Sequence, residues 1–210
     1  MILPKKDKDG VPYLSYSQIS GFLYNKSDYI KSYFLNESIQ FTTYIDFGSK
    51  VGEALEHNDF SAFDKDEQET LKKITRLDEF EREIRLDFPE YGFYVKGFID
   101  SINKKLDHII DYKTGGVNKV GEYEKDTYIQ GQLYALGIEQ HCKKLPKKVE
   151  VILIERYGNA FKGEPLKLGK EIIHIPIDIS AKRLQYAKDL VIDTAHEISK
   201  YWQIFNKLNK

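Results

Sequence analysis

The sequence predicts an α/β fold, a mixed central sheet flanked by helices. Three observations indicate it: apolar residues at helical spacing fill the first third of the chain, strand-like runs cluster in the middle, and helical segments separate and follow the later strands. A chain of 210 residues suffices for one sizeable core, and no Pro/Gly-rich linker interrupts it. We therefore expect residues 1–210 to form a single domain.

The first third of the chain is expected to be helical. Ser15 or Ser17 can cap a helix over about residues 17–35, where apolar residues recur at helical spacing. A second helix is expected over about 46–57 and a third, more polar one over about 65–76. The order of elements therefore begins with helices.

The middle and end of the chain combine strands with helices. Residues 83–88 alternate apolar and charged side chains, and the runs leading to Asp100 and Asp111 are rich in strand formers. A turn near residues 104–107 pairs those two runs as a hairpin. Pro176 indicates that the later strand over 172–179 lies at a sheet edge. The later elements are expected to be a loop near 116–125, a helix over 125–142, an apolar central strand over 149–154, a loop over 163–170, a strand over 172–179 and a helix capped by Ser180.

Composition argues against several classes of protein. The chain has a net charge of −1 and one cysteine, Cys142, which cannot build a disulfide framework, a zinc ribbon or an iron–sulfur cluster. No apolar run is long enough to cross a bilayer, and the start lacks a signal peptide. We expect a cytoplasmic, intracellular protein without membrane contact. The charge argues weakly against a nucleic-acid binder, but lysines cluster locally at Lys104, Lys105, Lys143, Lys144, Lys147 and Lys148.

The hairpin carries the candidate catalytic residues. Pairing around its turn brings Asp100 across from Asp111, and the period of two along a strand places Asp111 and Lys113 on one face. Two carboxylates can hold a divalent cation and a lysine can stabilise an anion, which is the minimum for metal-dependent phosphodiester cleavage. The alternative is a structural ion pair between Asp111 and Lys113. Gly97 indicates a close backbone approach or a bulge beside the site.

Five segments occur in one order between residue 14 and about residue 156: Leu14–Ile19, Phe47–Glu56, Gly97–Asp100, Asp111–Gly115 and Gln130–Tyr134. In that order they resemble a helix cap, a Gly-x-x-x-His-x-x-x-Glu helix, a Gly-x-x-Asp strand, an Asp-x-Lys-Thr-Gly strand and a Gln-x-x-x-Tyr helix. These are motifs of the PD-(D/E)XK nuclease superfamily, in its RecB-like exonuclease branch with phage and CRISPR-associated relatives. The resemblance implies a restriction-endonuclease-like fold and exonuclease-like hydrolysis of DNA with Mg²⁺ or Mn²⁺, in recombination, repair or phage DNA processing.

The resemblance also implies a metal site. Asp100 and Asp111 would ligate the cation, together with the backbone carbonyl of Tyr112 and the carboxylate of Glu56 or Glu53. Oxygen ligands of this kind select hard cations over zinc. One or two ions are both compatible with this set.

Other residues would act on the DNA. Lys113 would orient the attacking water or neutralise charge in the transition state. Gln130 and Tyr134 share a helix face, which in the family lines the site and meets the DNA backbone, and His141 lies near the same stripe. The alternative is that this face is half-buried and structural.

The chain departs from the family pattern in two places. Gly52 occupies the helix position of the usual metal-binding histidine. Glu56 lies one helical turn further along the same face and is the first candidate to replace the histidine as a metal ligand, and Glu53 is the second. His57 is expected to be a capping or surface residue. The cysteines that hold an iron–sulfur cluster in some relatives are also missing, so this version is expected to be cluster-free.

Two other functions remain possible from the sequence. A nuclease-fold DNA-binding module without catalysis is suggested by Gly52, and an intracellular scaffold by the near-zero net charge. The expected partner is DNA, single- or double-stranded and bound without sequence preference, with a helicase or recombination partner and an oligomer as further options. Tyrosines on or beside the first helix are candidates for stacking on unpaired bases, namely Tyr16, Tyr24, Tyr29 and Tyr33.

Overall fold

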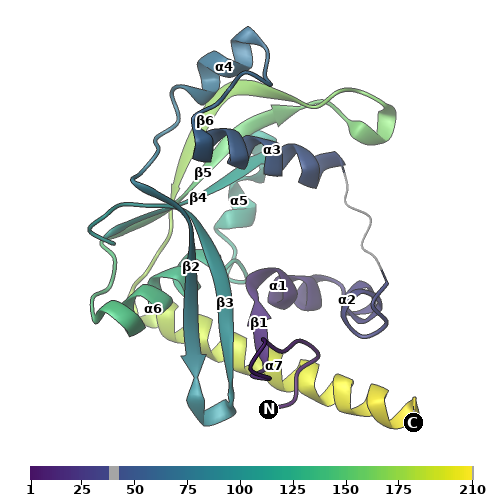
Figure 1. The fold of residues 1–210 in the computed structure, drawn as a ribbon. Coiled ribbons are helices and arrows are strands. Elements are labelled where there is room, and N and C mark those ends of the chain that lie inside the picture. Colours follow the sequence, from purple (N-terminus) through teal and green to yellow (C-terminus); the bar gives the residue numbers. More distant parts are fainter. Residues whose placement is uncertain (38–42, 210) are drawn as a thin grey trace.

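The computed structural model describes residues 1–37 and 43–209, which form a mixed six-stranded sheet flanked by helices (Figure 1). The sheet order is β1–β3–β4–β5–β6, and β2 pairs with β3. The β1–β3 and β4–β5 pairs are parallel, and the other three are antiparallel. The expected fold class is confirmed. The strands are β1 (Tyr13–Ser15), β2 (Glu79–Phe88), β3 (Phe93–Ile102), β4 (His108–Gly115), β5 (Lys148–Tyr157) and β6 (Lys167–Pro176).

The first expected helix is divided in two. Asn25 ends one helix and begins the next, because its side-chain oxygen accepts hydrogen bonds from the backbone N–H groups of Ser27 and Asp28. Ser15, rather than Ser17, caps the first of them by accepting from the N–H of Gln18. The helices are α1 (Tyr16–Tyr24), α2 (Lys26–Tyr33), α3 (Thr43–His57), α4 (Lys65–Leu71), α5 (Val120–Tyr123), α6 (Gln130–Cys142) and α7 (Ala181–Leu208).

Other boundaries also differ from the expectations. The helix expected over 65–76 ends at Leu71, the helix expected over 125–142 begins at Gln130, and the short α5 occupies part of an expected loop. The last strand covers Lys167–Pro176 instead of 172–179, because Lys167 and Leu168 pair with the far end of β5. Long-range pairing thus made a strand of residues expected to form a loop. β6 is the edge strand that Pro176 indicated, and Ser180 caps α7 as expected.

Two hydrophobic cores lie on opposite faces of the sheet. The first contains buried residues of α1, α6 and α7 together with Ile109 of β4, and the second contains buried residues of α3 and α4 together with Ile110 and Tyr112 of β4. Because side chains alternate along a strand, Asp111 and Lys113 share the first face with Ile109. In the described parts of the chain, no helix has both the length and the apolar character that a membrane crossing requires.

The sheet opens at the middle of β3. One edge of β3 pairs with β2 from Phe93 to Ile102, except at Asp100. On the other edge, β1 pairs with residues 94–96 and β4 pairs only with Ser101 and Ile102. This edge is therefore left without a strand partner at residues 97–100, a segment that we call the fork. Figure 1 shows β2 and β3 running away from β4 and β5 beyond this point.

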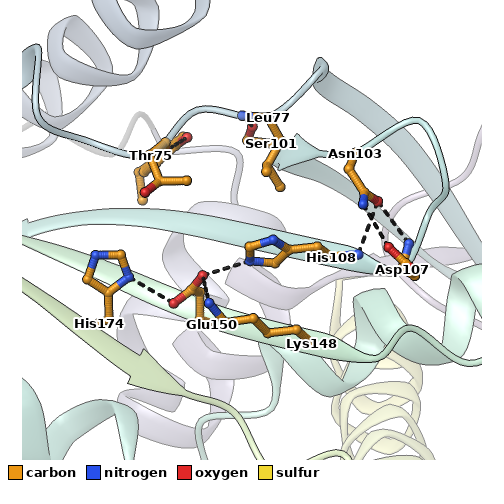
Figure 2. A network of polar contacts seen from close by, with 10 residues as sticks. Thr75, Leu77, Ser101, Asn103, Asp107, His108, Lys148, Glu150 and His174 are labelled. Atoms are coloured by element: carbon orange, nitrogen blue, oxygen red, sulfur yellow. Dashed lines mark hydrogen bonds and ion pairs between the residues drawn. The ribbon is translucent and has the colours of Figure 1, made fainter.

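A polar network holds β4 in place between its neighbours (Figure 2). The side chain of Asn103 bonds Asp107 and closes the β3–β4 turn. The buried carboxylate of Glu150 on β5 bonds His108 of β4 and His174 of β6 at 2.7 and 2.9 Å. Burial favours the neutral acid, but the hydrogen bonds from Lys148 and the two histidines outweigh it and lower the pKa of Glu150. The network connects three strands on the face opposite to Asp111.

Candidate active site

Asp100 and Asp111 meet at the fork. Pairing between β3 and β4 ends at Ser101 and Ile110, so Asp100 and Asp111 are the next residues on the two strands, as the hairpin register predicted. The backbone N–H of Tyr112 donates to Asp100 Oδ2 at 2.7 Å. The Asp100 carboxylate thus accepts the hydrogen bond that a backbone carbonyl would accept if β3 and β4 continued to pair. This hydrogen bond fixes the Asp100 side chain at the end of the hairpin.

Asp111 is the most buried group of the site. Its side chain is 1% exposed, and its Oδ2 atom lies 2.6 Å from Lys113 Nζ and accepts from the Tyr128 hydroxyl at 2.9 Å. The Oδ1 atom is buried and has no hydrogen-bond partner among the described residues. A buried carboxylate oxygen is costly to leave unpaired. The orphaned atom therefore indicates a missing ligand.

The charges at the fork are strongly coupled. Burial, and then the charge of Asp111, raises the pKa of Asp100 to about 7. Burial alone would lower the pKa of Lys113, but the carboxylates of Asp111 and Asp100 outweigh it and hold that pKa above its ordinary value. Two carboxylates compete for one ammonium group, an arrangement that an added cation would relieve.

The residues at the fork fit a hard divalent cation in part. Carboxylate oxygens suit Mg²⁺ or Mn²⁺, and Asp111 Oδ1 is free to accept one. Within residues 1–37 and 43–209, however, no three His, Cys, Asp or Glu side chains are already placed to hold a metal together. The structure places Asp100 and Asp111 side by side. Their role as ligands stays a prediction, as do those of Glu56, Glu53 and the carbonyl of Tyr112.

Two cavities meet at the site, and both are lined by Asp100 and Lys113. The first, of about 720 Å³, also contains Lys5 and Lys96, and we call it the basic cavity. The second, of about 620 Å³, also contains Glu53, Glu56 and Glu81, and we call it the acidic cavity. The fork therefore separates a surface suited to phosphate groups from one suited to cations.

Comparison with known proteins agrees with this geometry. The model of the "PD-(D/E)XK nuclease superfamily" matches residues 52–203, more than half of the chain. The chain belongs to the PD-(D/E)XK nuclease superfamily. The matched residues include Asp100, Asp111 and Lys113, and nucleases of this superfamily generally use divalent metal ions. No curated protein matches the chain.

Two solved structures are similar to this superfamily member at low sequence identity. The "putative exonuclease" from Eubacterium rectale is 12% identical, with a TM-score of 0.58 over 93% of this chain and 82% of that one. The alkaline exonuclease from Laribacter hongkongensis is also 12% identical, with a TM-score of 0.43 over 93% and 94% of the two chains. The first of these likenesses supports the fold.

The helix residues proposed as metal ligands line the acidic cavity. Glu56 is half-buried, and Glu53 and His57 are exposed. Gly52 adds no side chain, and a Cβ built there would meet no atom within 4 Å. The cavity is therefore open where many superfamily members carry a histidine.

We expect Glu56→Ala to weaken Mn²⁺ affinity by about tenfold and Glu53→Ala to weaken it less. Glu56 is the better ligand candidate because it is half-buried in the acidic cavity, whereas Glu53 is exposed at its rim. Calorimetric titration of both variants with Mn²⁺ measures the order. The reverse order would show that the other face of α3 binds the cation.

Gln130 and Tyr134 line the basic cavity together with Asp100 and Lys113, and their contact with DNA stays a prediction. The Gln130 amide donates to the Tyr134 hydroxyl at 2.6 Å. Tyr134 packs so closely on β3 that a Cβ at Gly97 would come within 2.9 Å of its ring, so Gly97 marks a close approach. His141, expected near this stripe, instead bonds the backbone carbonyl of Arg85 on β2 and lies outside both cavities.

The sequence interpretation missed Tyr128 and misjudged one of the tyrosines. Tyr128 precedes α6 and belongs to no motif, yet it is the hydroxyl donor to Asp111. Tyr29 is 2% exposed and packs in the first core, so it is not available for stacking on bases. Tyr16 and Tyr33 line the basic cavity, and Tyr24 is 93% exposed on α1. Only the folded arrangement distinguishes these tyrosines.

Proposed function

We propose that the protein is a Mg²⁺- or Mn²⁺-dependent deoxyribonuclease with exonuclease-like action. The observation that carries this proposal is the buried Asp111, which pairs with Lys113 through one oxygen and leaves the other free, next to Asp100. A structural ion pair alone would not explain an unpartnered buried oxygen beside a second carboxylate where two cavities meet. Family membership supports the nuclease, and the substrate and the metal are our inference.

The residues of the fork divide the work. Asp100 and Asp111 would hold the cation, which when bound polarises a phosphate and lowers the pKa of a bound water. Lys113 carries its proton firmly, so it serves to orient the water or to neutralise charge that develops on the phosphate. Tyr128 fixes the orientation of the Asp111 carboxylate. Gln130 and Tyr134 would donate to phosphate oxygens and position the strand.

The basic cavity is the proposed path of the DNA strand. Lys96 lies near the ring of Phe98 and also pairs with Glu83, and Lys5 lies near the ring of Tyr33, so each of these cations stands beside an aromatic ring that lines the cavity. This combination binds single strands without sequence preference. The lysine clusters noticed in the sequence lie elsewhere, and Lys147 and Lys148 are paired with Asp107 and Glu150.

We expect the double variant Lys5→Ala/Lys96→Ala to weaken DNA binding several-fold and to reduce the slope of log affinity against log salt by about 1–2. Each lysine lost removes a cation that can displace counterions from the phosphates. Fluorescence anisotropy with a labelled strand at several salt concentrations measures both quantities. The control Lys144→Ala/Lys147→Ala changes two lysines outside both cavities, and an equal loss there would contradict the proposed path.

The proposal is tested with a plasmid and an end-labelled single strand, incubated with Mn²⁺ with and without chelator. Cleavage that the chelator abolishes supports the deoxyribonuclease, and the digestion pattern of the labelled end distinguishes exonuclease from endonuclease action. Retarded DNA without cleavage would instead support a DNA-binding module that has lost catalysis, which the open space at Gly52 favours. If the protein neither cleaves nor retards DNA, the scaffold is favoured instead. Roles in recombination, repair or phage DNA processing, a helicase partner and an oligomer belong to the same proposal.

A further inference from the structure

Glu81 lies at the fork, on the strand opposite to Asp100. In the β2–β3 register Phe80 pairs with Ser101 and Arg82 with Ile99, and Glu81 and Asp100 stand opposite each other between these pairs without pairing in the ladder. Its φ angle is +48°, a left-handed conformation that a glutamate rarely adopts. The backbone of β2 is therefore irregular at a residue that lines the acidic cavity of the candidate site.

The side chain of Glu81 lines the acidic cavity with Glu56, Asp100 and Lys113. It is exposed and makes no hydrogen bond or ion pair with the residues that the structure describes. Partial desolvation of the Glu81 carboxylate, and then the charge of Glu56, raises the pKa of Glu81. The charge of Glu81 in turn contributes to the raised pKa of Asp100. The carboxylates are thus near enough to influence one another.

An independent observation points to a missing ligand here. Asp111 is only 1% exposed, and its Oδ1 atom has no hydrogen-bond partner among the described residues. Asp111 stands next to Asp100 across the hairpin. A hard cation at that oxygen needs further oxygen ligands, and the helix position that often supplies one is Gly52. Across β2, β3 and β4, the residues in line at the fork are Glu81, Asp100 and Asp111.

We propose that Glu81 supplies a third carboxylate to the cation held by Asp100 and Asp111. The proposal rests on the proposed function. Because the part of the chain that the structure describes has no three acidic groups already placed to ligate together, Glu81 must rotate into the site when the cation binds, which its exposed side chain permits. The left-handed backbone at residue 81 is then a feature of the metal site.

Calorimetric titration of the full chain with Mn²⁺ tests this role without measuring activity. Glu81→Gln, which keeps the size of the side chain, is expected to weaken Mn²⁺ affinity at least tenfold. The matched control is Glu79→Gln on the same strand, where the side chain pairs with Arg82, and its affinity is expected to stay within about twofold. Equal affinity of Glu81→Gln and the unmodified protein would overturn the proposal.

A second variant separates metal binding from folding. Glu81→Gly removes the carboxylate and relieves the left-handed backbone, so without metal it is expected to melt at or above the temperature of the unmodified protein. The increase in melting temperature that Mn²⁺ causes is expected to shrink. A full Mn²⁺-induced increase in this variant would contradict a ligand role.

The two proposals fail in different ways. If the unmodified protein binds Mn²⁺ and cleaves DNA while Glu81→Gln does both equally well, only the role of Glu81 is lost. If the unmodified protein shows neither Mn²⁺ binding nor cleavage, the proposed function itself is wrong, and the role of Glu81 falls with it.

Discussion

Asp111→Asn is expected to reduce metal-dependent DNA cleavage by at least about 100-fold and to weaken Mn²⁺ binding strongly. The substitution keeps the shape of the side chain but removes the charge that attracts the cation. It also places an amide group beside the Lys113 ammonium, where one carboxylate oxygen now lies 2.6 Å from Nζ. Initial rates with a labelled strand and calorimetry with Mn²⁺ measure the two effects.

The fold of the Asp111→Asn variant must be checked before its activity is interpreted. Far-ultraviolet circular dichroism and thermal melting provide that check, because Asp111 is buried and bonded to Tyr128. The matched control is Asp66→Asn, an exposed residue of α4 that lines neither cavity. Near-normal cleavage by a folded Asp111→Asn variant would refute a catalytic metal at the fork.

Lys113→Met is expected to abolish cleavage while Mn²⁺ binding stays nearly intact. The lysine pairs with Asp111 Oδ2, so its loss leaves the carboxylate oxygens in place and frees the oxygen that it occupied. Without metal, the variant is expected to lose about 1–3 kcal/mol in the free energy of unfolding, because buried Asp111 then lacks its cation. Added Mn²⁺ is expected to restore much of this stability, since the metal supplies the missing positive charge.

Three measurements examine the Lys113→Met variant: single-turnover cleavage, calorimetry with Mn²⁺, and denaturant unfolding with and without Mn²⁺. Lys119→Met, which changes a lysine outside both the basic and the acidic cavity, provides the control. A folded Lys113→Met variant that no longer binds Mn²⁺ would show that the ammonium group organises the metal site instead of acting on the substrate.

Much of the fold could be predicted from local sequence. Strand-forming runs separated by a polar turn identified the β3–β4 hairpin. Pairing the residues at equal distances on either side of that turn placed Asp100 beside Asp111. The alternation of side chains along β4 correctly placed Asp111 and Lys113 together. The amphipathic stripe and its serine cap identified α7. These features depend on neighbours along the chain, which the sequence displays directly.

Errors arose where distant segments decide the structure. The extent of β6 depends on pairing with β5. The break between α1 and α2 is a different kind of error, because it follows from a local cap by Asn25 that helical periodicity does not reveal. His141 turned out to bond a carbonyl of β2, a strand 56 positions away in the sequence. Periodicity within one segment carries no information about such contacts.

The sequence alone identified the candidate catalytic side chains, because two acids and a lysine at hairpin and strand spacing already define a candidate cation site. Only the tertiary structure decided where that site opens and what surrounds it. The cause is the separate pairing of β1 and β4 along one edge of β3, which leaves the fork between them. At that gap Asp100 and Lys113 line both the basic and the acidic cavity. The tertiary structure also brings Tyr128 and Glu81 to the site from segments without a motif.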